Sequence, residues 1–149
     1  MTSFSDELGQ IRSVFIDTAP IIYYIEANPQ YGPLVKDIVA AFQSGRLNAF
    51  TSVITLVEVL PKPVEAGNEA LAKQFSEFLI AGKNITMMEI TTGIAESAGN
   101  FRGRYSFLKT MDAIQIAASL EAEADAFITN DTKLKRISEI KIIVLKEYL

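Results

Sequence analysis

The stretch KTMDAIQIAASLEAEADAFITND, Lys109 to Asp131, determines how the rest of the chain is arranged. Its first part has the apolar face of a helix, and its last part contains the short apolar strand AFIT. A helix over Asp112–Glu123 rises by roughly 17 Å at ~1.5 Å per residue, and a strand over Ala126–Asp131 returns about the same distance at ~3.3 Å per residue. We therefore expect Asp112 and Asp131 to lie near each other, at the sheet edge where α/β proteins bind ligands.

Five short apolar segments predict strands, and helical patterns lie between them. The segments are SVFI (13–16), NAFTS (48–52), ITMMEI (85–90), AFIT (126–129) and KIIVL (141–145). Strands alternating with helices are typical of a parallel sheet wound with right-handed crossovers. The 49% hydrophobic content and the continuous apolar runs suit a sheet that is covered on both faces. The sequence thus predicts an α/β fold with a central, mostly parallel sheet.

The predicted helices begin and end at identifiable residues. Pro61 and Pro63 are expected to stop one helix, and Gly99 and Gly103 to weaken the end of another. At 149 residues the chain has the length of one ordinary domain. We predict a single domain over 13–149, preceded by a loosely held arm over 1–12. The expected helices cover 20–27, 34–43, 53–60, 68–82, the beginning of 91–106, and 111–123.

Composition excludes several classes of function. No apolar run approaches the ~18 residues of a membrane span, and the N-terminus MTSFSDELGQ lacks a signal region. We therefore expect a cytoplasmic protein without a membrane partner. The chain has no cysteine and no histidine, which rules out thiol nucleophiles, Ser-His-Asp catalysis and the usual zinc ligand sets. Carboxylate chemistry remains.

Four acids stand apart from the other acidic residues by their positions. Asp17 follows the first strand, Glu58 lies in the helix after the second, and Asp112 and Asp131 flank the organising helix and strand. All four map to one edge of the predicted sheet. Four carboxylates in one cleft repel each other, and a cation of charge two or more would keep them ionised. The predicted ligand is Mg²⁺ or Mn²⁺, which can activate water for phosphodiester hydrolysis without histidine.

Four motifs in this order resemble the PIN domains, named for the PilT N-terminus, which are largely metal-dependent ribonucleases and include the VapC-type toxins. FIDTAPIIYYIE resembles the first motif, SVITLVEVL the second, and LKTMDAIQIAASLEAEADAFITND the third and fourth, together spanning roughly 14–145. The resemblance implies a three-layer α/β/α fold for a PIN-like nuclease domain over 13–149. It also implies a Mg²⁺- or Mn²⁺-dependent endoribonuclease, the toxin of a toxin–antitoxin pair.

The family's functional residues transfer to particular positions of this chain. Asp17, Glu58, Asp112 and Asp131 match the acidic metal-site positions, which are also the catalytic ones, and Thr129 matches the small hydroxyl residue beside the fourth acid. Each acid also has a plainer interpretation. Asp17 and Asp131 are candidates to cap the helical segments that follow them, Asp112 to complement a helix dipole behind Thr110 as N-cap, and Glu58 to belong to a solvated stripe with Thr55.

The predicted partners are RNA, an antitoxin protein and a second copy of the chain. Arg102, Arg104 and Lys109 precede Asp112 and are candidates to hold RNA phosphates, although solvated helix faces are the alternative. The apolar helices 34–42 and 68–79 and the segment IIYYIE are expected to leave surface exposed for a homodimer. The resemblance places an antitoxin over the paired clefts, with an arginine among the carboxylates as one way to silence them.

Other classes of function fit the sequence less well than a ribonuclease. A phospho-acceptor module would need an acidic pair beside Asp17 and a lysine after a late strand, and neither is evident. A two-carboxylate glycosidase receives no support from the spacing. A PIN-fold protein that binds RNA or a partner without cutting is the better alternative. A degenerate member of that kind would be expected to have lost an acid, whereas all four are present here.

Overall fold

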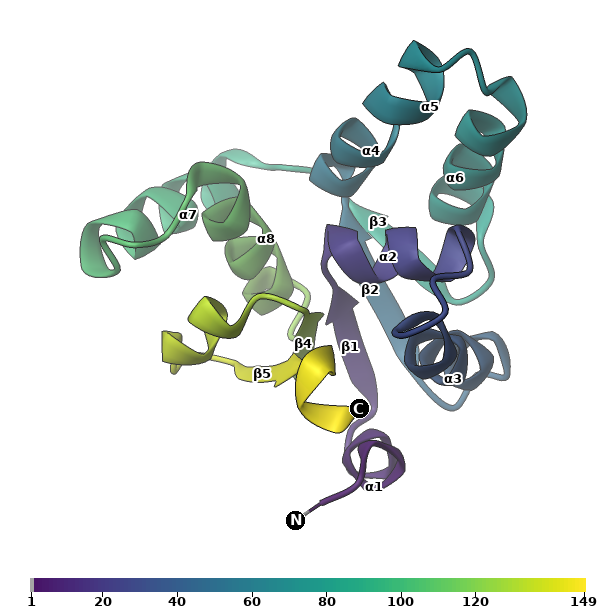
Figure 1. The fold of residues 1–149 in the computed structure, drawn as a ribbon. Coiled ribbons are helices and arrows are strands. Elements are labelled where there is room, and N and C mark those ends of the chain that lie inside the picture. The colour runs from purple at the N-terminus through teal and green to yellow at the C-terminus, as the bar shows by residue number, and fades with distance from the viewer. Residues whose placement is uncertain (1) are drawn as a thin grey trace.

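The computed structural model describes residues 2–149 and is built on one five-stranded sheet (Figure 1). The strand order is β3-β2-β1-β4-β5, and all neighbouring strands are parallel. This confirms the predicted α/β class and its parallel sheet. The strands are β1 (Ser13–Ile16), β2 (Asn48–Ser52), β3 (Ile85–Met88), β4 (Ala126–Thr129) and β5 (Lys141–Val144).

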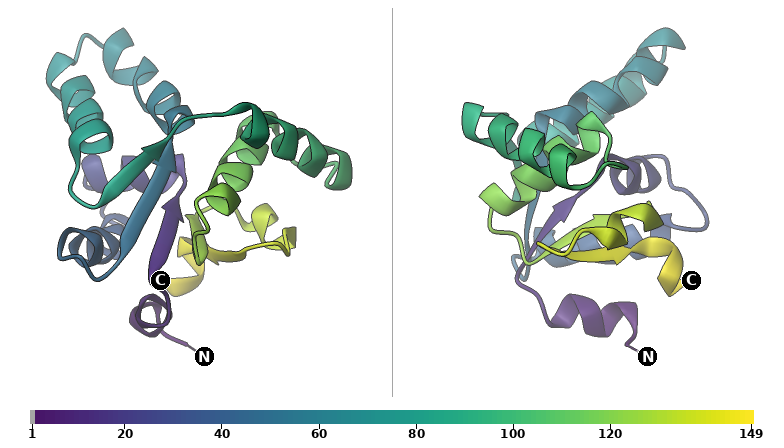
Figure 2. Two further views of the ribbon diagram at one scale, coloured as in Figure 1. Left: turned by 180° about the vertical axis from the view of Figure 1, so that it is seen from behind. Right: turned by 90° about the vertical axis from the view of Figure 1, so that its left-hand side faces the viewer.

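Helices cover both faces of the sheet, which makes the fold a three-layer α/β/α sandwich (Figures 1 and 2). One layer holds α2, α3 and α6, and the other holds α7 and α8. The helical segments are α1 (Phe4–Gly9), α2 (Thr18–Ile25), α3 (Gly32–Gln43), α4 (Val53–Val59), α5 (Pro61–Glu65), α6 (Glu69–Ala81), α7 (Thr92–Arg104), α8 (Thr110–Glu121), and the 3-10 helices η1 (Thr132–Arg136) and η2 (Leu145–Tyr148).

The alternation of side chains along the strands produces the two cores. Val14 and Ile16 of β1 face the core under α2 and α3, while Phe15 between them faces the core under α8. Phe15 stacks on Phe127 of the neighbouring β4, with ring centroids 5.4 Å apart. Both faces of the central strands are therefore fully buried, which explains their continuous apolar sequences.

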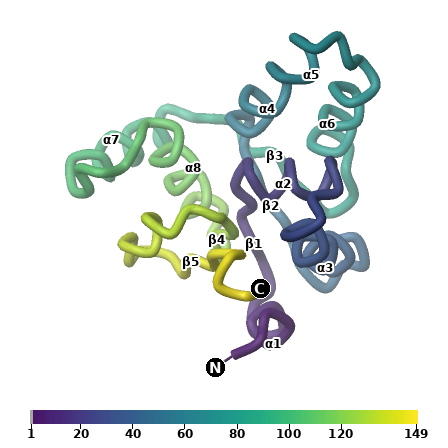
Figure 3. The backbone as a smooth tube through the Cα atoms, viewed as in Figure 1, coloured from purple at the N-terminus to yellow at the C-terminus, as the bar shows by residue number. Residues whose placement is uncertain are grey.

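The carboxyl ends of the strands share one edge of the sheet, and the chain leaves that edge into α2, α4 and η1. The ladder between β1 and β4 continues as far as Asp17, whose backbone N–H donates to the carbonyl of Ile128 at 2.9 Å. Helices α4 and α5 rise beyond this edge, as the backbone trace makes clear (Figure 3). The segments that carry the four acids therefore meet at one end of the molecule.

The N-terminal residues differ from the expectation of a loosely held arm over 1–12. Residues 4–9 form α1, in which Phe4 and Leu8 are buried in the core. Phe4 packs against Tyr148 at the C-terminal end of the chain, with ring centroids 5.3 Å apart, and Glu7 pairs with Lys141. Met1 lies outside the described residues, and a domain boundary at residue 13 stays a prediction.

Two predicted helix ends also differ from the structure. Pro61 and Pro63 do end α4, but Pro61 begins the short helix α5, because proline fits the first turn where its missing N–H has no role. Gly99 and Gly103 do not interrupt α7, whose Ile94, Ala98 and Phe101 are buried against α8. Tertiary packing thus outweighs the low helix propensity of glycine. Among residues 2–149 there is no helix with both the length and the apolar character needed to cross a bilayer.

Candidate functional site

Asp17 lies where β1 passes into α2 and is held by hydrogen bonds to both of its carboxylate oxygens. Oδ1 accepts from the backbone N–H of Thr18 at 2.9 Å, so Asp17 caps α2. Oδ2 accepts from the hydroxyl of Thr129 at 2.8 Å. Burial, with the charges of Asp112 and Glu58, raises the pKa of Asp17 from 3.8 to about 6, even though both hydrogen bonds lower it. The carboxylate is positioned well but is costly to ionise.

Glu58 projects from α4 and is exposed, but one of its oxygens is fixed. Its Oε1 accepts from the hydroxyl of Thr18 at 2.6 Å. Thr18 therefore contacts two acids, because its backbone N–H donates to Asp17 and its side chain donates to Glu58. The hydroxyl of Thr18 also lies 3.1 Å from that of Thr55, one turn before Glu58 in α4. Glu58 is therefore more than part of a solvated stripe, because Thr18 joins it to Asp17.

Asp112 lies in the first turn of α8 and is partly buried. Burial raises its pKa, as do the charges of Asp131 and Glu58, and the charge of Lys109 lowers it. The prediction that Thr110 caps this helix is wrong. Lys109 occupies the cap position without a side-chain capping bond, and Thr110 is the first helical residue. The helix can start without a cap because Ala113 and the residues that follow it are buried against the sheet.

Asp131 and Thr129 form the fourth corner of the site. Asp131 caps η1, since its Oδ1 accepts from the backbone N–H of Lys133 at 3.0 Å. The backbone N–H of Asp131 donates to the hydroxyl of Thr129 at 3.2 Å, and that same hydroxyl donates to Asp17. Thr129 is 1% exposed, so a buried hydroxyl joins the first and fourth acids.

The four acids influence one another across the site. The charges of Asp112 and Glu58 contribute to the raised pKa of Asp17, and those of Asp131 and Glu58 contribute to the raised pKa of Asp112. The ion pairs found within residues 2–149 join other side chains, so none of the four acids is in an ion pair with a lysine or arginine there. Within the part of the chain that the structure describes, no three acidic side chains form a compact group able to hold a metal ion. The structure thus gathers the acids into one electrostatic neighbourhood without arranging them as a closed ligand cage.

The chemistry of these donors fits a hard divalent cation. Carboxylate and hydroxyl oxygens are the ligands that Mg²⁺ and Mn²⁺ prefer, and the site offers oxygens alone. Each capping acid uses Oδ1 for its cap, which among residues 2–149 leaves Oδ2 of Asp131 without a donor and Oδ2 of Asp17 with one. Capping and metal binding are therefore compatible roles for Asp17 and Asp131.

The predicted phosphate-binding residues differ in how free they are. Arg104 pairs with Glu139 at 3.2 Å and lies over the ring of Phe101, 4.6 Å from its centroid. Arg102 donates from Nε to the carbonyl of Leu108 at 3.4 Å. Lys109 makes no ion pair among the described residues and is near enough to lower the pKa of Asp112. Lys109 is the best placed of the three beside the acids.

Sequence reasoning missed the polar residues beneath the acids. Thr51, Ser52, Thr55 and Gln115 are each 0–1% exposed and hydrogen-bonded to one another. One feature of the sequence could have indicated these residues: Gln115 is a single amide on the otherwise apolar face of the helix over 112–123. Asn130 also has a structural role, donating from Nδ2 to the hydroxyl of Tyr23 at 3.2 Å and accepting from the backbone of Lys146.

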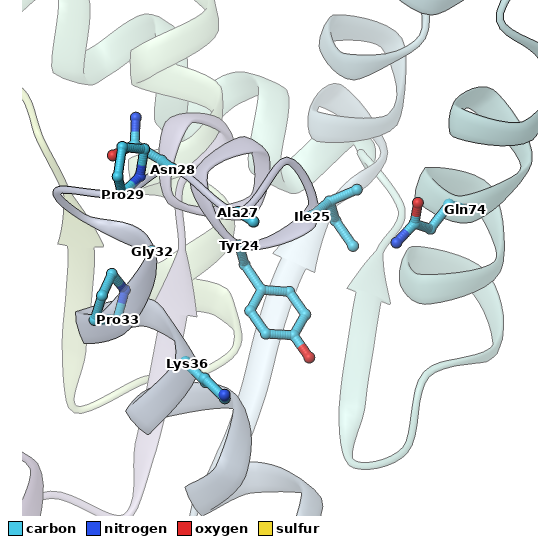
Figure 4. A pocket seen from close by; sticks show the side chains of 9 residues that line it. All are labelled: Tyr24, Ile25, Ala27, Asn28, Pro29, Gly32, Pro33, Lys36 and Gln74. Carbon is cyan, nitrogen blue, oxygen red and sulfur yellow. The ribbon is translucent and has the colours of Figure 1, made fainter.

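A hollow lined by none of the four acids lies between α2, α3 and α6 (Figure 4). Its volume is about 540 Å³. Tyr24, Lys36 and Gln74 bring polar groups to it, while Ile25 and the prolines supply apolar walls. The apolar helices that were expected to leave surface exposed are mostly buried, since Val35, Ile38, Phe42, Phe75 and Leu79 all belong to the core. Large exposed apolar side chains remain at Val57, Val64, Ile80, Met111 and Leu149.

Comparison with known proteins places this geometry in a family. The model of the PIN domain family matches residues 14–140. A comparison with curated proteins found no match. Among solved structures, a chain from VapBC2 of Rickettsia felis, bound to a DNA fragment from its promoter, superposes with a TM-score of 0.72 at 15% identity, covering 89% of this chain and 98% of that one.

Two further structures have the same fold. A chain from DNA-bound VapBC of Salmonella typhimurium gives a TM-score of 0.69 at 18% identity, with coverage of 91% and 99%. VapC20 of Mycobacterium tuberculosis, described as a toxin that cleaves the sarcin-ricin loop, gives 0.63 at 16% identity, with coverage of 76% and 86%. At these identities the likeness concerns the fold.

Proposed function

Since this chain belongs to the PIN domain family, we propose that it is a divalent-metal-dependent endoribonuclease that hydrolyses phosphodiester bonds. One observation carries the proposal. Four carboxylates from four separate segments lie at one sheet edge, burial together with their mutual repulsion raises the pKa values of Asp17 and Asp112, and none of the four forms an ion pair among the described residues. Acids that repel each other do not stabilise a fold by themselves. A group of carboxylates with raised pKa values is instead typical of a site that binds a cation.

Asp17, Glu58, Asp112 and Asp131 would hold Mg²⁺ or Mn²⁺. Such an ion supplies an activated water and stabilises charge on a phosphoryl oxygen. The chain's own part is to orient the acids: Thr129 and the backbone of Thr18 fix the carboxylate of Asp17, and the hydroxyl of Thr18 fixes Glu58. Asp17 and Glu58, held in this way, lose little rotamer freedom when an ion binds.

Lys109 and the two nearby arginines are the proposed contacts for the RNA backbone. Lys109 precedes Asp112 directly at the start of α8, so a phosphate that it held would lie near the acids. Arg104 would have to share its charge with Glu139, and Arg102 would have to leave the carbonyl of Leu108. We therefore expect Lys109 to contribute more to RNA binding than either arginine.

We also propose that the protein is the toxin of a toxin–antitoxin pair, forms a homodimer and acts in the cytoplasm. The proposal is supported by the fold that it shares with chains of VapBC complexes. We assign an antitoxin segment to the hollow between α2, α3 and α6, to which Ile25, Pro29 and Pro33 contribute apolar walls (Figure 4). Val57, Val64 and Ile80, exposed on the α4–α6 segment, are the surface we assign to the second copy.

The direct test is cleavage of unstructured RNA by the purified protein, with Mn²⁺ in one arm and EDTA in the other. Asp17→Asn, which is nearly isosteric, is the matched inactive variant. The proposal expects cleavage by wild type with Mn²⁺ alone and none by the variant. RNA binding without cleavage in any arm would favour the alternative of a non-catalytic PIN-fold binding module. Equal cleavage in EDTA, or by Asp17→Asn, would contradict the metal site.

A further inference from the structure

A group of uncharged polar side chains is buried where β2, α4 and α8 meet. Thr51, Ser52 and Thr55 come from the end of β2 and the beginning of α4, and Gln115 comes from α8. All four are 0–1% exposed, and each has hydrogen-bond partners. The side chain of Gln115 lies on the core face of α8. Burying its amide costs free energy unless both the oxygen and the nitrogen are hydrogen-bonded.

Both ends of the Gln115 amide bind α4. Its Oε1 accepts from the hydroxyl of Ser52, and its Nε2 donates to the hydroxyl of Thr55 at 2.8 Å. Ser52 is the N-cap of α4, where its Oγ accepts from the backbone N–H of Ile54 at 3.1 Å. One side chain of α8 therefore grips the first turn of α4 at two points.

The contacts continue from α4 to the acids. The hydroxyl of Thr55 lies 3.1 Å from that of Thr18, which donates to Glu58 at 2.6 Å. The backbone N–H of Thr18 donates to Asp17. Gln115 is three residues after Asp112 in α8, and Thr55 is three residues before Glu58 in α4, so each lies one turn from an acid on the same side of its helix.

We propose that Gln115 is a positioning residue, whose amide fixes α4 against α8 and so sets Glu58 relative to Asp112. The proposal rests on the proposed function, because these acids matter together only if they share a ligand. An apolar side chain of the same size would fill the space, but it would not fix the rotation of α4. Hydrogen bonds are directional, whereas apolar packing is not. Partners behind metal ligands typically change metal affinity or activity about 10–100-fold when removed.

The test uses variants that keep volume and remove hydrogen bonds. Gln115→Met removes both contacts to α4, and Thr55→Val removes the hydroxyl through which the link continues. Thr55→Ser keeps that hydroxyl and serves as the conservative counterpart. Ser119→Ala is the matched control, because Ser119 is a fully buried polar residue of the same helix whose hydroxyl donates to the carbonyl of Ile116 and not to α4.

The main readout is Mn²⁺ binding measured by calorimetry in the absence of RNA. We expect Gln115→Met and Thr55→Val to bind Mn²⁺ about tenfold more weakly than wild type, while Thr55→Ser and Ser119→Ala bind it as wild type does. The double variant Gln115→Met/Thr55→Val should be no weaker than the worse single variant, because both changes break one link. In RNA cleavage, kcat should fall with KM for RNA unchanged.

The outcomes separate this inference from the proposed function. If wild type binds Mn²⁺ and Gln115→Met binds it equally well, the positioning role is refuted and the proposed function stands. If Ser119→Ala weakens Mn²⁺ binding as much as Gln115→Met does, the effect is a general loosening of α8 and the role is likewise refuted. Absence of Mn²⁺ binding by wild type would overturn the proposed function and this inference together.

Discussion

Asp17→Asn should stabilise the metal-free protein at neutral pH, although it alters the centre of the site. The pKa of the Asp17 carboxyl rises to about 6 in the folded protein, chiefly through burial. Between pH 3.8 and about 6 the folded state thus holds a proton that the unfolded state has released, so stability falls as pH rises through this window. Above it, the charged carboxylate opposes folding at a constant cost, and asparagine removes that cost.

The expected gain follows from the pKa and the hydrogen bonds. A rise from 3.8 to about 6 corresponds to about 3 kcal/mol against folding at pH 7.5. Asparagine can still accept from the backbone of Thr18, but its amide would face Thr129, whose hydroxyl now donates to Asp17. Turning that bond around costs about 1 kcal/mol. The net stabilisation should be ~2 kcal/mol, or a rise in Tm of roughly 4–8 °C for a domain of this size.

The assay is urea unfolding in EDTA at pH 7.5 and at pH 4.5. At pH 4.5 wild-type Asp17 is mostly protonated, so the advantage of the variant should vanish or reverse. Asp37→Asn is the matched control, because Asp37 is exposed on α3 and should change stability by less than about 0.5 kcal/mol at either pH. A variant that is less stable than wild type at pH 7.5, or equally favoured at both pH values, would refute the description of Asp17 as a partly buried carboxylate without an ion-pair partner.

Further measurements address the ion, the RNA and the second copy. Mn²⁺ at about a hundred times its Kd should stabilise the wild type by ~2.7 kcal/mol, with the effect declining below pH about 6 as Asp17 is protonated; no Mn²⁺ effect on urea unfolding would remove the cation site. The double variant Arg102→Ala/Arg104→Ala should flatten the salt dependence of RNA binding, and Lys109→Ala should flatten it more per charge removed. Unchanged slopes would show that these three side chains are solvated and do not contact RNA. Light scattering should give a mass that rises with concentration above the 16.4 kDa of one chain; a constant 16.4 kDa would exclude the dimer.

The elements with a strong local pattern could be predicted from the sequence. SVFI, NAFTS and AFIT became strands with the predicted bounds, because apolar residues with both faces buried have few alternatives. Their order along the chain, with helices between, was enough to infer parallel pairing. The positions of the four acids followed from this topology, since the carboxyl ends of parallel strands share one edge. Their roles as ligands stay predictions.

What the sequence concealed depends on contacts between distant residues. Six residues, FSDELG, form α1, which Ser3 caps and whose Phe4 packs against Tyr148 at the other end of the chain, a contact that no local pattern indicates. The absence of a cap at Thr110 is of the same kind, since burial of α8 compensates for it. Gln115 is the most instructive case. Its partners Thr55 and Ser52 lie 60 and 63 residues earlier in sequence, so these contacts can be seen only in the structure.

The capping and ligand interpretations of Asp17 and Asp131 need not compete. Each acid caps the segment that follows it with Oδ1, which fixes the carboxylate and leaves Oδ2 directed elsewhere. Oδ2 of Asp17 accepts from Thr129, whose hydroxyl also accepts from the backbone of Asp131, so the two caps are joined through one buried side chain. A cap thereby does what a supporting residue does in a metal site, because it lowers the entropy that a carboxylate loses on binding an ion. Removing the caps should therefore weaken ion binding even where the second oxygen is kept.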